Sequence, residues 1–460
     1  MPPSVALLLW LSLLVGLLCL DPAREPRTSA ALWVSIAWMF IISSRLPSQW
    51  FGGQVGSTLE ALEDGNSIDR VVYSLLILLA IGILMTRSFN WSGFAVRNIA
   101  LSGFLFFTLL SVLWSDFPLI AAKRWFRDLG NYLSILVILS DPCPFEALRT
   151  FFRRLCYLLV PLSVVIIKYF PATGIHYSFW TGAPEYVGVA TSKNTLGFLC
   201  LMSGLFLVWD TVTRWPEQRQ KITRRIFVVN FVLFLMTVWL LRLSNSATSE
   251  LCLLVGCLSI VIVSSKWGRR HLNMIKILIP SSFFIYAVLA FGFGLNGELA
   301  RGIGRDPTLT GRETIWNAVL STNTNPLIGT GYQSFWLGPR LEQVWRIAGP
   351  INEAHNGYLD TYLNLGMIGL MLVGLLLISA FKRICFNLEA SPSLASLGSA
   401  FFLITLLYNI TEASFTAPFL CVAILLETTV VPGMRIAPRS TEKSAPSVAA
   451  AVRGRGSVPI

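Results

Sequence analysis

The residues best suited to chemistry stand where a polar segment runs into an apolar one, in EAHNGYLDTYLNLGMIGLMLVG (353–374). His355, one of three histidines in the chain, lies at this junction, followed by Asn356, Asp360 and Asn364 at four-residue spacing. A neutral imidazole can accept a proton near physiological pH, so His355 is a candidate general base. The three polar residues share one helical face, from which they could bind a substrate or hydrogen-bond to neighbouring helices.

A second set of candidates is basic and lies just upstream of this junction. The segment 295–356 carries five arginines: Arg301, Arg305, Arg312, Arg340 and Arg346. A guanidinium group binds phosphate oxygens in a two-pronged way, so these side chains could hold an anionic ligand. Contact with lipid headgroups is the simpler alternative for any one of them. Capped by Thr310 or Gly311, a short helix is expected to carry Arg312 and Trp316.

The elements that position these residues are membrane helices, because the 460-residue chain is 54% hydrophobic and only 13% charged, with mean hydropathy +0.65. A spanning helix takes about 20 mostly apolar residues. Apolar runs occur at 4–20, 30–45, 69–86, 98–114, 126–140, 154–170, 196–212, 225–241, 248–265, 274–294, 357–380, 396–411 and 415–431. The sequence therefore predicts an all-α, polytopic integral membrane protein with about 12–13 transmembrane helices.

The basic residues predict how the helices are oriented. With the N-terminus outside, the inside loops collect most of the Lys and Arg, as in RQKITRR (219–225) and KWGRRH (266–271). The net charge of +12 then reflects membrane topology and not a nucleic-acid partner. The domain prediction follows in chain order: N-terminal transmembrane helices (1–294), one long periplasmic catalytic loop (295–356), C-terminal transmembrane helices (357–431) and a disordered cytoplasmic tail (432–460). The eight cysteines form no C-x-x-C pair and indicate no zinc site.

Several spaced motifs together resemble one protein family. The pattern H-N-x9-G-x-x-G-L begins at His355 and follows G-R-x-x-x-W (311–316) and P-L-x-G-x-G (326–331). Upstream, SVLWSDFPLIAAKRW (111–125) and GVATSKNTLG (188–197) are similar to further family segments. The set resembles the bacterial O-antigen ligase and exopolysaccharide polymerase superfamily. Its members are inner-membrane glycosyltransferases that move glycans from undecaprenyl diphosphate to an acceptor on the periplasmic face.

The resemblance assigns roles to particular residues. His355 and Arg312 are the expected catalytic pair, with His355 as base and Arg312 stabilising the diphosphate in a single inverting displacement. The expected substrate-binding residues are Arg124, Lys193, Arg242, Arg305 and Asn356. One departure is Ser244-Asn245, where many members carry Ser-Arg or Ser-Lys, and Arg242 just upstream is the expected substitute. His176, in GIHYSFW, could be a second site residue.

No cofactor is expected and no metal site is predicted, although the isolated outside acids Asp306, Glu313 and Glu353 leave a metal open as an alternative. The chain has no D-x-D triplet, the usual metal–diphosphate clamp, so arginines are expected to take the role of the metal. The expected partners are a lipid-linked glycan donor, a glycan, lipid or protein acceptor, and membrane lipids. Two alternatives stay open: a polymerase that extends the glycan on the lipid carrier, and a transporter for a lipid-linked glycan. The sequence names neither the sugar nor the acceptor.

Overall fold

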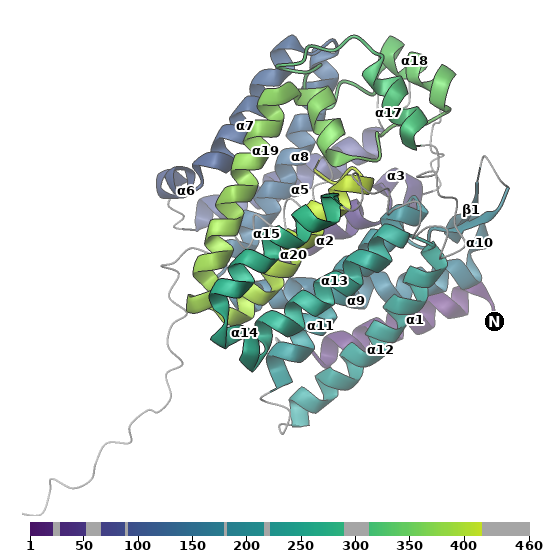
Figure 1. Cartoon of the computed structure of the whole chain (residues 1–460). Coiled ribbons are helices and arrows are strands. Elements are labelled where there is room, and N and C mark those ends of the chain that lie inside the picture. The colour runs from purple at the N-terminus through teal and green to yellow at the C-terminus, as the bar shows by residue number, and fades with distance from the viewer. Residues whose placement is uncertain are drawn as a thin grey trace, which may run out of the picture. The chain divides into compact units, whose positions relative to one another are not determined.

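The computed structural model describes residues 1–21, 28–51, 66–87, 91–178, 182–215, 221–288 and 312–415 (Figure 1). The first half contains α1 (Pro3–Cys19), α2 (Leu32–Ser43), α3 (Pro47–Trp50), α5 (Ser67–Thr86), α6 (Trp91–Arg97), α7 (Ile99–Leu110), α8 (Pro118–Leu139), α9 (Pro144–Tyr169), α10 (Pro171–Gly174) and α11 (Lys193–Arg214). The second half contains α12 (Lys221–Ser244), α13 (Ala247–Ser264), α14 (Lys266–Arg270), α15 (Leu272–Ala287), α17 (Arg312–Leu320), α18 (Gly338–Ala348), α19 (Gly357–Ala390) and α20 (Pro392–Thr411). A short 3-10 helix, Ser111–Trp114, follows α7. The strands β1 (Ile175–Tyr177) and β2 (Pro184–Tyr186) form an antiparallel hairpin in which His176 is opposite Glu185.

Seven of the described helices are long and apolar enough to cross a bilayer, and the bent pair formed by α6 and α7 would make an eighth. This confirms the all-α polytopic membrane class, but the described residues do not reach the expected 12–13 spans. The runs 4–20 and 30–45 form helices of only 17 and 12 residues. The run 415–431 and the predicted tail 432–460 lie almost wholly outside the described residues. The first half of helix α8 carries four charged residues, Lys123, Arg124, Arg127 and Asp128, whereas its second half carries none.

Helix α20 forms the centre of the helical bundle, because every residue from Leu394 to Thr411 is buried. Helices α11, α13, α15 and α19 pack around it. Helix α12 lies further out, and apolar side chains at helical spacing cover its outer face: Val228, Phe231 and Leu235 are each more than half exposed. An exposed apolar stripe of this kind suits contact with lipid.

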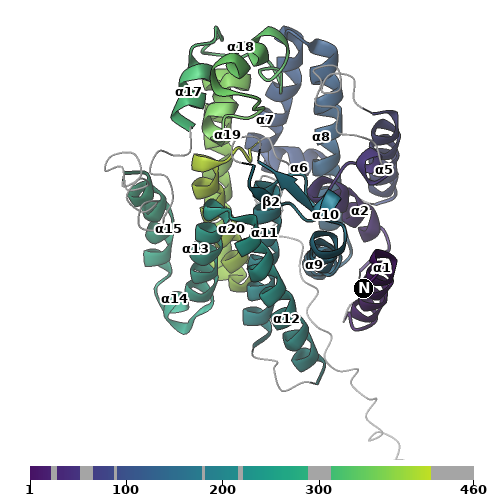
Figure 2. The same cartoon turned by 90° about the vertical axis from the view of Figure 1, so that its right-hand side faces the viewer.

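Helix α13 connects the two ends of the bundle. Near its start, Thr248 Oγ1 lies 2.8 Å from Thr411 Oγ1, next to Glu412. At its other end follows the basic helix α14, whereas α17 and α18 lie at the opposite end of the bundle (Figures 1 and 2). We call the end with Glu412, α17 and α18 the site end. The basic segment 266–271 and the candidate site thus lie at opposite ends, as the topology prediction requires; which end faces the periplasm stays a prediction.

Candidate functional site

Glu412, which follows α20 directly, collects polar partners from distant parts of the chain. Its Oε1 lies 3.0 Å from Arg312 Nη2, and its Oε2 lies 3.3 Å from His355 Nδ1. Asn194 Nδ2 donates to both carboxylate oxygens at 3.2 Å. Glu353 Oε1 lies 3.0 Å from the same histidine nitrogen. These five residues, the Glu412 cluster, bring together the two residues that the sequence predicted to be catalytic.

The cluster is assembled from the ends of four elements. Arg312 begins α17, Asn194 lies in the first turn of α11, and His355 precedes α19. The start of α19 lies directly on the end of α20, since Gly357 N donates to the Glu412 carbonyl at 3.0 Å. A Cβ atom on Gly357 would lie 2.0 Å from Asn409 Oδ1, so this approach needs glycine. The predicted helix containing Arg312 and Trp316 is confirmed as α17.

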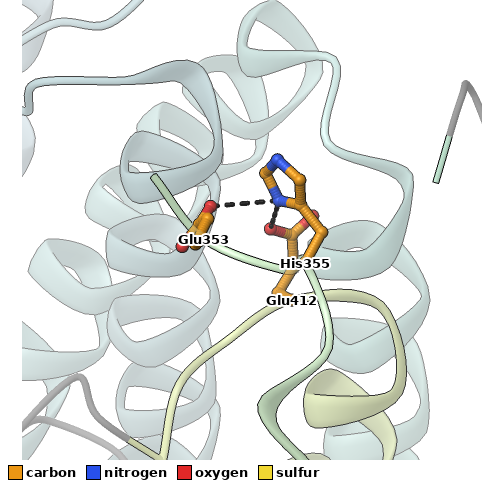
Figure 3. Close-up of side chains that lie close together, drawn as sticks. All are labelled: Glu353, His355 and Glu412. Carbon is orange, nitrogen blue, oxygen red and sulfur yellow. Dashed lines mark hydrogen bonds and ion pairs between the residues drawn. The ribbon is translucent and has the colours of Figure 1, made fainter. Parts of the chain in front are cut away.

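His355 itself adopts a rare backbone conformation, with φ of 48°. A positive φ is uncommon outside glycine and is typical of residues whose side chain is held in place for function. Here it turns the ring so that Nδ1 faces both Glu353 and Glu412, while the second ring nitrogen points away from them (Figure 3). The side chain is 25% exposed. The second nitrogen is therefore the histidine atom that a substrate can meet.

The two carboxylates determine the charge of His355. Burial alone would lower the pKa of the ring, but hydrogen bonds and charge attraction from Glu353 and Glu412 outweigh it and raise the pKa from 6.5 to about 10. The resting site therefore holds an imidazolium at neutral pH. The sequence predicted a neutral His355 acting as base, whereas the two neighbouring acids, which the sequence did not reveal, favour the protonated ring.

The cluster at rest contains two cations and two anions. Glu412 is nearly buried, with 7% of its side chain exposed, and it is occupied by Arg312, Asn194 and His355. Glu353 is 40% exposed, and His355 is its ion-pair partner among the described residues. Glu412 thus holds the cations in position, whereas Glu353 is open to an incoming group.

The polar stripe on α19 is structural. Asp360 Oδ1 accepts hydrogen bonds from Trp336 Nε1 at 3.0 Å and from Ala354 N at 3.2 Å. Asn364 Oδ1 accepts from Phe335 N at 3.2 Å. These contacts bind the 312–356 segment to α19, together with an apolar cluster that includes Ile315, Val344 and Leu363.

Asn356, predicted to bind substrate, caps α19: its Oδ1 accepts a hydrogen bond from Leu359 N at 3.0 Å. Asn356 is adjacent to His355 in the chain, but its side chain makes this hydrogen bond within the first turn of its own helix. Gly366, the first glycine of the H-N-x9-G-x-x-G-L pattern, allows both a kink and close packing. Its φ is 65° within α19, and a Cβ there would lie 2.3 Å from the Leu327 carbonyl.

Arg124 lies at the site end but outside the Glu412 cluster. Its Nη1 donates to the Gln333 carbonyl at 2.6 Å, within the turn that follows P-L-x-G-x-G. The neighbouring motif segment joins the same turn, because Trp114 Nε1 donates to the Ile328 carbonyl at 3.1 Å and Ser115 Oγ lies 2.6 Å from Ser334 Oγ. These family-like segments thus meet in space and support the 312–356 segment.

The other predicted substrate-binding residues are less closely connected to the Glu412 cluster. Lys193 adjoins Asn194, but its Nζ lies 2.7 Å from Glu185 Oε1 on β2. Arg242, 77% exposed, lies 3.5 Å from Glu250 Oε2 and makes no contact with the Glu412 cluster among the described residues. Arg305 lies outside the described residues.

A metal could be held by Glu353, His355 and Glu412, whose candidate ligand atoms lie within 4.8 Å of one another. The donors are largely engaged, however. Glu412 accepts from Arg312 and Asn194, and the high pKa keeps a proton on the His355 nitrogen that faces both acids. A metal would have to displace this proton and compete with a guanidinium. The arrangement therefore fits a site whose positive charges come from the Arg312 and His355 side chains better than it fits a metal site.

Sequence reasoning missed Glu412 and Asn194 and treated Glu353 only as an isolated acid. Asn194 lay within the quoted GVATSKNTLG segment. The signal for Glu412 was its position in NITEASF (409–415), a carboxylate in a three-residue gap between two apolar runs. An acid at such a junction needs a partner, but the sequence does not say which.

Comparisons with known proteins bear on this site. Residues 231–374 match the family model described as O-antigen ligase, a range that includes Arg242, Arg312, Glu353 and His355 but not Glu412. The exopolysaccharide production protein ExoQ of Rhizobium meliloti (strain 1021) is 27% identical over 292 residues, which cover 60% of this chain and 63% of that protein. The chain thus matches somewhat less than two thirds of this relative's length.

Proposed function

We propose that this multi-pass bacterial membrane protein is a glycosyltransferase, because residues 231–374 match the O-antigen ligase family model. It moves a glycan from an undecaprenyl-diphosphate carrier to an acceptor hydroxyl on the periplasmic face of the inner membrane. The observation that carries this proposal is the convergence of Arg312 and His355 on Glu412 at the end of the membrane helices. A lipid-held diphosphate at the bilayer surface would meet both cations there.

The cations suit the leaving group. When the glycosyl bond breaks, the departing diphosphate takes the electron pair and gains negative charge. Arg312 can bind phosphate oxygens with its fork, and the free nitrogen of the His355 imidazolium can donate a further hydrogen bond. Fixed donors aimed at developing charge supply much of the stabilisation in reactions of this kind. These two organic cations take the role that a metal has in other diphosphate enzymes.

The acceptor completes a single inverting displacement. Its hydroxyl oxygen forms the new bond to the anomeric carbon while the bond from that carbon to the diphosphate oxygen breaks. The hydroxyl proton must go to a base, which a protonated His355 cannot be. Glu353 is the open carboxylate beside His355, and we assign the proton to it. His355 thus remains at the reacting centre but acts on the leaving group.

Variants of the cluster test this division of roles, measured as donor-analogue affinity in detergent and as glycan transfer in a complemented deletion strain. Arg312→Ala and His355→Ala should lose both, because each removes a cation. Arg312→Lys should recover part of the affinity, since an ammonium keeps the charge without the fork. Glu353→Gln should keep donor affinity and lose transfer by about 10²–10⁴.

The matched control is Arg346→Ala, which removes an 80% exposed arginine from the same segment outside the cluster. It should retain both donor affinity and transfer. Wild-type transfer by Glu353→Gln would show that the proton goes elsewhere. Wild-type transfer by His355→Ala would remove His355 from the mechanism.

Polymerisation is the second candidate, favoured by the name of the relative, an exopolysaccharide production protein. In that reaction the acceptor hydroxyl belongs to another lipid-linked glycan, and the same cluster would serve. Mass spectrometry of glycans from a deletion strain separates the two. Loss of a polymer ladder on the lipid carrier indicates a polymerase, and accumulation of long lipid-linked chains indicates a ligase.

A further inference from the structure

A cavity of about 810 Å³ opens at the β1–β2 hairpin and shares no residue with the Glu412 cluster. Its wall combines Arg45 and Gln49 on one side with His176 and Tyr177 of β1 on the other, and Thr191 also lines it. The elements that form it are the short α3, α10 and β1, none of which is a membrane span. The cavity is therefore lined by segments outside the candidate membrane spans.

Arg45 is a buried cation that has no carboxylate partner among the described residues, which leave out 52–65. It is 7% exposed, and its Nη2 donates only to backbone carbonyls, to Thr173 at 2.6 Å and to Gly188 at 3.4 Å. Its Nε is buried and makes no hydrogen bond. The other strongly buried arginines described, Arg149 and Arg153, each face an aspartate. A buried charge is costly when it has no counterion, and the part of the chain that the structure describes supplies none to Arg45, so an anion bound in the cavity would stabilise this site.

His176 adds no second positive charge. Burial lowers the pKa of its ring, and the charge of Arg45 lowers it further, while Glu185 opposes them more weakly. At neutral pH the cavity thus combines one guanidinium with a neutral imidazole, an amide and hydroxyl groups. Such a lining hydrogen-bonds hydroxyls as well as one oxyanion, and Tyr177, 73% exposed, offers a ring face to the C–H surface of a sugar.

We infer that this cavity is an acceptor subsite that binds a carboxylate-bearing sugar of the acceptor glycan, an inference that rests on the proposed glycan transfer. The cavity volume falls within the range of about 300–1,000 Å³ that is usual for small-ligand pockets and suits a short stretch of glycan. The guanidinium fork of Arg45 binds the carboxylate, and the polar wall binds the hydroxyls.

The hairpin connects this subsite to the reacting centre. His176 on β1 pairs with Glu185 on β2, and Glu185 binds Lys193 at 2.7 Å. The next residue, Asn194, binds Glu412. An acceptor held in the cavity would therefore reach toward the Glu412 cluster along the hairpin, while the donor approaches from the membrane. This arrangement also gives the Lys193–Glu185 pair a role in setting the position of the hairpin.

Binding to the full-length protein in detergent tests the inference. The probe is a tetrasaccharide that contains glucuronic acid, and its neutral control is cellotetraose, both measured by calorimetry. The wild type should bind the acidic probe in preference. Arg45→Gln should weaken this binding by about tenfold to a hundredfold, the effect of losing a charged hydrogen bond, and should leave donor-analogue affinity unchanged.

A second variant guards against misfolding of Arg45→Gln. Gln49 Oε1 accepts a hydrogen bond from Leu46 N at 3.3 Å, and Gln49→Glu keeps this acceptor while adding a carboxylate to the cavity. It should raise the melting temperature, because Arg45 gains a counterion, and should abolish the preference for the acidic probe. Arg346→Ala, which changes an 80% exposed side chain outside the cavity, is the control and should keep this preference.

Three outcomes would overturn the inference. They are equal affinity of the wild type for the acidic and neutral probes, unchanged acidic binding in both variants, and displacement of the acidic probe by phosphatidylglycerol micelles, which would assign the site to lipid phosphate. Transfer and donor binding are measured on the same samples. If the proposed function is wrong, the wild type will show neither glycan transfer nor donor binding. If only the acceptor-subsite inference is wrong, the wild type will still show glycan transfer and donor binding.

Discussion

The charge of His355 gives the sharpest test of the site. Its pKa is raised from 6.5 to about 10, a difference that corresponds to about 5 kcal/mol at 1.36 kcal/mol per unit. This energy comes from two carboxylates at 3.0 and 3.3 Å from one ring nitrogen, opposed by burial. Removing the charge of one carboxylate should lower the pKa by about 1–3 units. Glu412→Gln and Glu353→Gln each do so with little change of shape.

The assay is nuclear magnetic resonance of protein labelled with ¹⁵N-histidine in detergent. The chain has only three histidines, and the His355→Gln spectrum identifies the signal of interest. In the wild type this ring should stay protonated past pH 8 and titrate at about 10. Glu342→Gln is the matched control, since this exposed acid pairs with Arg346 away from the cluster, and it should not change the titration.

The same shift predicts how stability depends on pH. The folded-state pKa of His355 lies above the unfolded value, so the folded state binds the proton more tightly. The stabilisation is complete below about pH 6.5 and is lost as the pH rises through about 10. Thermal unfolding of the wild type should therefore weaken over this range more steeply than that of Glu412→Gln. A wild-type His355 that titrates at or below pH 7, or one that ignores both substitutions, would refute this account of the site.

Three further predictions concern topology, the missing family arginine and the kink. Ser321→Cys, at an exposed position after α17, should react with a membrane-impermeant reagent in cells with an intact inner membrane, whereas the native exposed Cys143 should react only after permeabilisation. If Arg242 replaces the family residue, Arg242→Ala should reduce transfer nearly as much as Arg312→Ala, and wild-type turnover would exclude that role. Gly366→Ala should destabilise the protein by about 2–4 kcal/mol in denaturant unfolding, because it combines a positive φ with a backbone clash, and a loss below about 0.5 kcal/mol would contradict this reading.

The features that can be predicted from the sequence are those that depend on residues close together in the chain. Apolar runs predict membrane helices because a bilayer imposes one length and one composition on them. The motif spacing also led to His355 and to Arg312 at the start of a helix. The count of 12–13 spans stays a prediction, because the described residues hold seven helices that could cross a bilayer, or eight with the bent pair α6 and α7, and the run 415–431 lies almost wholly outside them.

The contacts that give the site its chemistry were not predictable, because they join residues far apart in the chain. Glu412 follows His355 by 57 residues and Asn194 precedes Glu412 by 218, so no local pattern links them. The protonation state of His355 depends on such neighbours, which favour the charged ring, whereas the sequence pointed to the neutral one. The polar stripe on α19 shows the converse. Its spacing was real, but Asp360 and Asn364 serve to bind the 312–356 segment to α19, and Asn356 caps this helix.

The position of Glu412 suggests why a diphosphate enzyme would keep a carboxylate against its own cations. Without a donor, Arg312 and His355 would repel each other in a site that is only partly exposed to water, and Glu412 offsets both charges. A diphosphate brings more charge and more acceptor oxygens than one carboxylate, so it can bind the outer side of the same cations while Glu412 holds the inner side. In the proposed reaction, Glu412 therefore keeps the two cations oriented before the donor arrives, and the developing charge on the leaving group would meet a site that needs little rearrangement.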